Sequence, residues 1–306
     1  MGTLEGVQLG PYVIGRRLGK GTTGTVHYAF DGQSNHPVAV KFLAEHYLSD
    51  ASMLALFVDE ARACATLDHP HIVRALRTGK YEGRPFIIFE YVQGHTLQNL
   101  LQSGAQSEGA CVWILRQMTQ ALRELARKEI VHQDLKPSNI IVEPGGNCRL
   151  VDLGFARQRD GMDWEGLAAG TALYMSPEQC RGGRGVKIDS RSDQYSLGAT
   201  MYYAATGAPP FDGENDKAVM WAHLQTPLEP PVQRNARLSL PFSMILSKML
   251  AKDPAHRYAT PEALLMDLRK LNVEAKPPIV TGSRIFSHET VPVSSRRKIS
   301  RLLGLS

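Results

Sequence analysis

The sequence predicts an α+β chain that folds into two lobes, a small antiparallel sheet lobe followed by a larger, mostly helical one. The chain has 306 residues, which at about 150 residues per domain corresponds to two units. Polar and apolar residues alternate around glycines between residues 11 and 45, a pattern typical of antiparallel strands. From Leu97 onward, apolar residues recur at helical spacing. Strands followed by helices indicate an α+β arrangement.

The first lobe is expected to contain a sheet and one main helix. The alternation predicts strands within residues 11–45, and further strands are expected at residues 72–77 and 85–91. Between these groups, apolar residues at helical spacing predict a helix over residues 53–67.

The second lobe is expected to be built from helices. A hinge near residues 90–94 should join it to the first lobe, and pockets favour such junctions. The predicted organisation is therefore a segment 1–10, a first lobe of about 11–90, a second lobe of about 95–271 and a tail 272–306. The helices expected in the second lobe cover residues 110–128, 192–205, 218–224, 241–250 and 261–271.

The positive charge of the chain is concentrated in its tail. The net charge is +5, and residues 272–306 hold six basic and two acidic side chains, which leaves the body nearly neutral. A neutral body argues against a nucleic-acid partner. The tail also contains serines and prolines, so we expect it to be flexible. Its basic residues 296–301 predict contact with an anionic membrane surface, which phosphorylation of Ser294, Ser295 or Ser300 would weaken. An inert solvated tail is the alternative.

The overall composition is that of an ordinary globular protein. Hydrophobic residues make up 43% of the chain and charged residues 21%. The four cysteines are widely spaced, which argues against a disulfide scaffold or a zinc ribbon. No apolar run approaches the roughly 20 residues that span a bilayer, and the first residues lack the apolar core of a secretion signal. A cytoplasmic location is therefore expected.

The first chemical motif is a glycine-rich segment, in which Gly19, Gly21 and Gly24 precede Val26 in a G-x-G-x-x-G-x-V pattern. A Rossmann turn would be followed by a helix, but strand-like alternation continues here. A Walker A loop would end in Gly-Lys-Ser or Gly-Lys-Thr, which is absent. The pattern favours a glycine-rich hairpin that covers a bound nucleotide, with its backbone N–H groups near the phosphates. A plain glycine-rich hairpin is the alternative.

A lysine and a glutamate follow this segment. Lys41 closes the strand Val-Ala-Val-Lys, and beside a phosphate loop it would bind phosphate oxygens. Glu60 lies in the predicted helix beside Phe57 and Ala61. A carboxylate on an inner face needs a cation, so we predict a pair between Lys41 and Glu60. A solvated Glu60 is the alternative.

The strongest motif is Val-His-Gln-Asp-Leu-Lys-Pro-Ser-Asn at residues 131–139. Asp134 is suited to accept a proton from an attacking hydroxyl. Lys136 would neutralise charge on a transferring phosphate, and Asn139 offers an oxygen to a hard divalent cation. Asp152 follows an apolar strand and precedes Gly154, a placement that suits Mg²⁺.

These motifs resemble, in identity and order, those of the eukaryotic-like (Hanks-type) serine/threonine protein kinases, over about residues 10–271. The segment Gly-Thr-x-x-Tyr-Met-Ser-Pro-Glu at residues 170–178, and Asp193 beyond it, resemble the bacterial members. The resemblance implies the two-lobed protein-kinase fold, the cofactors ATP and Mg²⁺, and transfer of the γ-phosphoryl group to Ser or Thr of a protein.

The resemblance also implies a role for each site residue. Asp134 would be the catalytic base, assisted by Lys136, with Thr171 seating the substrate hydroxyl. Asn139 and Asp152 would hold Mg²⁺. Lys41, positioned by Glu60, would bind the α- and β-phosphates under the loop of Gly19, Gly21 and Gly24. Glu178 would pair structurally with Arg257. The adenine would lie among Leu18, Val26, Ala39 and Ile141, beside the hinge backbone of Glu90 and Val92 and the gatekeeper Phe89.

Three positions depart from the family pattern. Leu153 replaces the usual Phe after the metal-binding Asp, and Ser176 replaces Ala before Pro177. Gln133 replaces the usual Arg before Asp134. A neutral amide cannot form a charge-assisted pair with a phosphorylated activation loop.

The activation loop also lacks an acceptor for that phosphate, because residues 155–169 contain no Ser, Thr or Tyr. We therefore predict that the loop reaches its active shape without phosphorylation there. Either apolar anchoring by Trp164 or Leu167, or pairing of Arg157 and Arg159 with nearby acids, would hold it. The alternative is that a partner protein or a second copy of the chain orders the loop and the helix carrying Glu60.

Two other functions were weighed against that of a protein kinase. A pseudokinase or scaffold module would be favoured by loss of Lys41, Asp134, Asn139 or Asp152, and all four are present. A small-molecule phosphotransferase of related fold is disfavoured by residues 170–178, which resemble a platform for a protein substrate.

Overall fold

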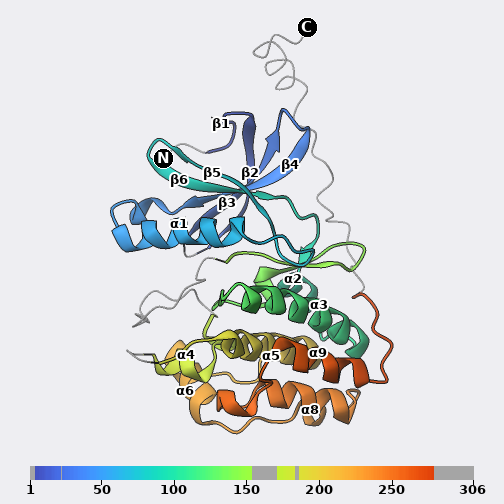
Figure 1. The fold of residues 1–306 in the computed structure, drawn as a ribbon. Helices are drawn as coiled ribbons and strands as arrows, with labels where there is room; N and C mark the ends of the chain where they lie inside the picture. The colour runs from blue at the N-terminus through green and yellow to red at the C-terminus, as the bar shows by residue number, and fades with distance from the viewer. Residues whose placement is uncertain (1–3, 22, 154–170, 183–185, 279–306) are drawn as a thin grey trace.

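The computed structural model describes residues 4–21, 23–153, 171–182 and 186–278. A sheet lobe stands above a helical lobe, and the chain passes between them after β6 (Figure 1). The predicted α+β, two-lobed fold is therefore confirmed.

The first lobe is a six-stranded sheet in the order β1-β2-β3-β4-β6-β5, in which all neighbours are antiparallel. Gly24 begins β3 and lies so close to β4 that a Cβ there would come within 1.8 Å of the Phe42 carbonyl oxygen. Glycine is therefore required at this position for the strands to pair. The strands are β1 Gln8–Leu9, β2 Tyr12–Lys20, β3 Gly24–Asp31, β4 His36–Leu43, β5 Ala75–Tyr81 and β6 Arg84–Glu90.

One long helix, α1 (Ala51–Ala65), lies beside this sheet (Figure 1). It begins two residues before the predicted start at residue 53, because the Asp50 carboxylate caps it by accepting hydrogen bonds from the N–H groups of Ser52 and Met53. Its inner face buries Phe57 and Cys64 together with Glu60, as the apolar spacing predicted. The helix therefore brings a carboxylate into the interior of the lobe.

The strand predicted at residues 72–77 is wrong in position. Ile72 and Val73 are buried, but Ile72 pairs only in an isolated parallel bridge to Leu150, and the Val73 N–H donates to the Leu150 carbonyl. Strand β5 starts later, at Ala75, and lies at the edge of the sheet, where most of its residues are exposed or half-buried. An edge strand that faces water has few buried apolar residues, so it shows little apolar alternation in the sequence. The apolar residues that led to the prediction, Ile72 and Val73, are instead buried at the contact between the lobes.

The second lobe is helical, and its core surrounds α3, which packs against α5 and α9. All four cysteines are free and buried. The five longer helices were predicted to within about two residues at each end. The helices are α2 Leu97–Leu101, α3 Glu108–Arg127, α4 Pro177–Arg181, α5 Ser190–Thr206, α6 Asp216–Gln225, α7 Pro231–Arg234, α8 Leu240–Met249 and α9 Pro261–Lys270.

A second, small sheet of three short strands lies in this lobe: β7 (His95–Thr96), β8 (Ile140–Val142) and β9 (Cys148–Leu150). Of these strands only β9 was predicted, as the apolar strand before Asp152. The strands β7 and β8 were not predicted, because strands of two or three residues leave no periodicity. Its strands begin or end beside Asn139 and Asp152, so it fixes the ends of the segments that carry the candidate site.

The first part of the tail packs against the body instead of leaving it. After α9 the chain turns back along α3 (Figure 1), and the Lys276 N–H donates to the Gly109 carbonyl, 3.3 Å away. Val273 and Ala275 pack on the core, and Pro278 is buried. A Cβ at Gly109 would lie 2.6 Å from the Glu274 carbonyl oxygen, so the fit is close.

We expect a chain ending at residue 278 to be more stable than one ending at residue 271. The longer chain buries Val273, Ala275 and Pro278, and partial burial of three such side chains contributes about 2 kcal/mol. Urea unfolding of the two truncated proteins measures the difference. Equal midpoints and equal slopes would show that this segment adds nothing to the folded body.

Candidate active site

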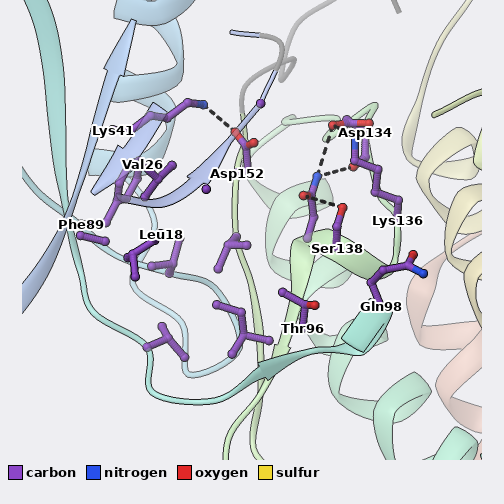
Figure 2. Close-up of a pocket in the computed structure, with 18 of the residues that line it drawn as sticks. Leu18, Val26, Lys41, Phe89, Thr96, Gln98, Asp134, Lys136, Ser138 and Asp152 are labelled. Carbon is purple, nitrogen blue, oxygen red and sulfur yellow. Dashed lines mark hydrogen bonds and ion pairs between the residues drawn. The ribbon is translucent and has the colours of Figure 1, made fainter. Parts of the chain in front are cut away.

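A cavity of about 690 Å³ lies between the lobes and contains most of the predicted site residues. Figure 2 shows Leu18, Val26 and Phe89 near Lys41, with Asp152 between Lys41 and Asp134. The predicted residues that line the cavity are Leu18, Gly19, Gly21, Val26, Ala39, Lys41, Phe89, Glu90, Val92, Asp134, Lys136, Asn139, Ile141, Asp152 and Thr171.

Two predicted site residues do not line the cavity, and each has a structural position instead. Gly24 was expected beside the phosphates, but it lies against the Phe42 carbonyl, where it allows β3 and β4 to pair. Glu60 is 3% exposed and lies behind Lys41, so it reaches the cavity only through that lysine.

Lys41 is the centre of a buried charge cluster. Its Nζ lies 2.7 and 2.8 Å from the two carboxylate oxygens of Glu60, as predicted, and 2.6 Å from Oδ1 of Asp152. Burial alone would lower the pKa of the lysine, but the carboxylates of Asp152 and Glu60 outweigh it and raise that pKa. Lys41 therefore stays protonated and links the sheet lobe, α1 and the segment after β9.

Asp152 presents a carboxylate to the cavity. Its side chain is 40% exposed, and its backbone has the left-handed φ of 62°, an uncommon conformation for a residue other than glycine. Burial would raise the pKa of this carboxyl, but Lys41 outweighs burial and lowers it. Leu153, 1% exposed, packs in the core behind it, so the apolar replacement at this position is accommodated.

Asp134 lies at the other end of the cavity, where its carboxylate contacts two polar side chains (Figure 2). Lys136 Nζ lies 2.8 Å from Asp134 Oδ2, and the Asn139 amide donates to the same oxygen over 3.2 Å. Lys136 also donates to Thr171 Oγ1, 3.2 Å away. The structure thus brings the four predicted catalytic residues together.

The second carboxylate oxygen of Asp134 is not used by the rest of the described protein. Oδ1 is buried and has no hydrogen-bond partner among the described residues. Burial raises the pKa of this carboxyl, although Lys136 opposes the shift. A carboxylate with a raised pKa and an unpartnered oxygen is suited to accept a proton from a hydroxyl.

The backbone that carries Asp134 is fixed from α5. Asp193, which is 1% exposed, accepts hydrogen bonds from the N–H groups of His132 (2.7 Å) and Gln133 (2.8 Å). Asn139 donates to the Asp134 carbonyl over 2.8 Å, which closes the loop from its other end. The loop geometry therefore depends on residues well separated along the chain.

The side chain of the hinge residue Glu90 binds other parts of the protein. Its carboxylate accepts from the Arg74 N–H (2.8 Å) and pairs with the Arg149 guanidinium. Glu90 lines the cavity beside Tyr91 and Val92, at the apolar end that also contains Leu18, Val26, Ala39 and Ile141. This end suits a flat, mostly apolar ring with a polar edge.

Several cavity residues were missed by the sequence analysis. Val73, Val151 and Leu173 are apolar residues without a motif, and Thr96, Gln98 and Tyr203 come from β7, α2 and α5. Tertiary packing alone brings them to the cavity. For Val151, its position immediately before Asp152 was a usable signal.

The structural pair between Glu178 and Arg257 forms as the resemblance implied. The guanidinium donates to both carboxylate oxygens, at 2.7 and 2.8 Å, and Ser192 Oγ donates to one of them. Burial would raise the pKa of Glu178, but the hydrogen bonds from Arg257 outweigh it and lower that pKa. The expected loop anchors Trp164, Leu167, Arg157 and Arg159 lie outside the described residues.

The donor set fits the cofactors that the resemblance implies. Gly19 and Gly21 line the cavity, and a Cβ at either position would meet no atom within 4 Å, which leaves space for phosphates. Asp152 and Asn139 offer the hard oxygen ligands that Mg²⁺ prefers. Among the described residues no group of three His, Cys, Asp or Glu side chains is placed to bind a metal unaided. A cation held jointly by these two residues and by substrate phosphates agrees with that finding.

Comparison with known proteins identifies relatives along most of the chain. The family model described as "Protein kinase domain" matches residues 12–268. The serine/threonine-protein kinase PknB of Mycobacterium leprae is 36% identical over 275 residues, covering 87% of this chain and 44% of its own length. The probable serine/threonine-protein kinase PknB of Bifidobacterium longum is 34% identical over 273 residues, covering 85% of this chain and 39% of its own.

A solved structure shows the same architecture. The Mycobacterium tuberculosis PknI kinase domain is similar with a TM-score of 0.68 and 25% identity, covering 88% of this chain and 99% of that one. The present chain therefore matches nearly all of that kinase domain, but spans less than half the length of the two PknB kinases.

Proposed function

The chain belongs to the protein kinase family, and on that premise we propose that it transfers the γ-phosphoryl group of ATP to serine or threonine hydroxyls of a protein. The observation that carries the proposal is the unpartnered Oδ1 of Asp134. Asp134 lines one cavity with Lys136, Asn139 and Asp152 and with the phosphate-binding candidate Lys41.

Nucleotide binding uses the sheet lobe and the hinge. Leu18, Val26, Ala39 and Ile141 enclose the adenine, and the backbone of Glu90 and Val92 meets its polar edge. The backbone of Gly19 and Gly21 covers the phosphates, and Lys41 reaches the α- and β-phosphate oxygens. The pairing of Lys41 with Glu60 is what holds this ammonium in the cavity.

Mg²⁺ is the proposed metal, held by Asp152 and Asn139 and by the phosphate oxygens of the nucleotide. When bound, it supplies positive charge that draws the phosphates together and offsets charge developing on the leaving oxygen. The lowered pKa of Asp152 keeps its carboxylate ionised and ready to bind a cation at neutral pH.

The acceptor hydroxyl is proposed to approach Asp134. Oδ1 accepts its proton, while Lys136 holds Oδ2 and carries a positive charge toward the transferring phosphoryl group. Thr171 is held by Lys136 and lines the same end of the cavity, where it seats the substrate hydroxyl. Catalysis of this kind depends on positioning and electrostatics more than on covalent chemistry.

The proposal is tested with ATP carrying a labelled γ-phosphate. The purified chain is incubated with Mg²⁺ and a generic basic protein, and the label is traced to the chain, to that protein and to particular amino acids. Label on phosphoserine or phosphothreonine is the expected result. Label that remains in ATP would indicate the pseudokinase alternative, and label found only on a small molecule would indicate a small-molecule phosphotransferase.

Contacts with other molecules belong to the same proposal. A protein substrate follows from the kinase family, and a nearly neutral body gives no reason to expect nucleic acid. The basic tail supports contact with an anionic membrane surface, but its serines Ser294, Ser295 and Ser300 lie outside the described residues. No helix within the described ranges is long and apolar enough to cross a membrane. A homodimer that orders α1 is the alternative mode of activation.

A further inference from the structure

Gln179, on α4, joins the start of that helix to the backbone just before Asp134. Its side chain is 2% exposed, and its Nε2 donates to the Gln133 carbonyl over 2.8 Å. Its Oε1 accepts from both the N–H and the Oγ of Ser176, each at 3.0 Å. Both polar groups of the Gln179 amide therefore form hydrogen bonds. Its NH₂ group binds the loop that carries Asp134, and its oxygen binds Ser176, the N-cap residue of α4.

The peptide that Gln179 binds is held in an unusual shape. Gln133 has a φ of +65°, in the left-handed region that residues other than glycine seldom adopt. Such a conformation persists when its surroundings determine it from several sides. Asp193 binds the N–H of Gln133 (2.8 Å), and Gln179 binds its C=O (2.8 Å). Two buried side chains from different helices thus bind the backbone N–H and the backbone C=O of Gln133.

This residue sets the direction in which Asp134 leaves the backbone. Asp134 follows Gln133 directly and lines the cavity, and its carboxylate has one oxygen bound by Lys136 and the other without a partner among the described residues. A rotation of the preceding peptide would turn that unpartnered oxygen away from an incoming hydroxyl. The hydrogen bond from Gln179 opposes this rotation on the carbonyl side.

The other end of the amide leads to the substrate side of the cavity. Ser176 ends the segment that begins at Thr171, and within it the Met175 N–H donates to the Ala172 carbonyl. Thr171 accepts from Lys136. The path from Gln133 through Gln179 and Ser176 to Thr171 and Lys136 therefore returns to Asp134 (2.8 Å from Lys136). These contacts connect Gln179 to Asp134, Lys136 and Thr171, the residues that we propose to bind the acceptor hydroxyl.

We propose that Gln179 is a positioning residue, which couples the segment 171–176 to the catalytic loop through neutral hydrogen bonds and so orients Asp134. The inference rests on the proposed kinase function. It also gives a physical reason why a neutral Gln133 suffices here. The loop is tied to α4 through its backbone carbonyl, and that bond requires neither an arginine nor a phosphate.

The test compares Gln179→Met with Gln117→Met. Gln117 on α3 is a matched control, because it is buried, donates to the Gly146 carbonyl (3.1 Å) and accepts from the Cys148 N–H (2.9 Å). Both substitutions remove an amide of the same kind, so both should lower Tm similarly. Only Gln179→Met should lower kcat, by about 10-fold or more, because misplacement near 1 Å costs up to about 10²-fold. The affinity for Mg-ATP should be unchanged in both.

A second variant isolates the hydrogen bond to Gln133. Gln179→Glu keeps oxygens that accept from Ser176 but has no donor for the Gln133 carbonyl, so its kcat should fall as in Gln179→Met. If Gln179→Met fails to fold, Gln179→Glu still tests whether this hydrogen bond affects kcat. Wild-type kcat in either folded Gln179 variant, or an equal loss in Gln117→Met, would overturn the proposal. An inactive wild type would instead contradict the kinase function itself.

Discussion

Asp134→Asn is expected to lower phosphoryl transfer by about 10³-fold while leaving Mg-ATP binding nearly unchanged. An amide cannot accept the hydroxyl proton, and general-base catalysis contributes about 10²–10⁴-fold. The nucleotide contacts proposed for Lys41 and Asp152 do not involve Asp134, and a buried asparagine of the same size preserves the packing. Turnover on a protein substrate and titration with Mg-ATP measure the two effects separately.

Asp152→Ala is the companion variant for this experiment. It removes the carboxylate that we propose as a metal ligand, and it also removes one of the two partners of Lys41. Mg²⁺-dependent nucleotide binding should therefore be lost together with activity. Full turnover in Asp134→Asn would contradict the assignment of the base, and unchanged Mg-ATP affinity in Asp152→Ala would contradict the proposed metal site.

Arg257→Met is expected to destabilise the helical lobe by about 3–5 kcal/mol, because it leaves a buried carboxylate without its cation. The side chains of Arg257 and Glu178 are 0% and 5% exposed. The guanidinium also donates to the carbonyls of Ala251 (2.9 Å) and Arg191 (2.8 Å). Urea unfolding at neutral pH measures the change.

Lys270→Met provides the matched control, since the pair of Lys270 and Asp267 is largely exposed. Such a surface pair contributes about 1 kcal/mol or less.

The stabilisation by the buried pair of Glu178 and Arg257 depends on pH with a definite sign. The pKa of Glu178 is lowered below its ordinary value of 4.5 in the folded state, so its contribution is present above that pH and is lost as the pH falls through the lower value. The difference in free energy of unfolding between wild type and Arg257→Met should therefore become smaller at acidic pH. A loss equal to that of Lys270→Met would show that the buried pair adds no more than a surface pair.

The predictions that the structure matches are those in which chemistry and spacing occur together. The buried Glu60 required a cation, and Lys41 was the available one in the same lobe. The close spacing of Asp134, Lys136 and Asn139 placed them on one short loop. These relations are local, or follow from the cost of burying a charge, so the sequence reveals them.

The predictions that failed depended on tertiary packing. The strand at residues 72–77 was misplaced because Ile72 and Val73 bury themselves against β9, while the true edge strand faces water. The phosphate-binding role of Gly24 stays a prediction, and what tertiary packing adds is the need for glycine there at the close approach of β3 to β4. Gln179 gave no signal, because an amide that binds a backbone carbonyl 46 residues earlier has no pattern in the sequence.

The regulatory prediction concerns residues 155–169, which contain no Ser, Thr or Tyr and lie outside the described residues. The described contacts support it from the catalytic side. The Gln133 N–H is bound by the Asp193 carboxylate and its C=O by the neutral Gln179 amide, and neither of these bonds involves a phosphate. We therefore expect the catalytic loop to have its working geometry in a protein that carries no phosphate.

We expect the chain to be a protein kinase whose activity does not require its own phosphorylation. The progress curve of an unphosphorylated sample tests this expectation most directly. The chain is treated with a phosphatase, its intact mass is checked for the absence of phosphate, and incorporation into a peptide substrate is followed from the first seconds after Mg-ATP is added. Phosphate should appear linearly from the start, at the rate shown by protein preincubated with Mg-ATP. The contradictory result is a lag that shortens with protein concentration and ends as Thr171 or Tyr174 becomes phosphorylated, or no transfer at all.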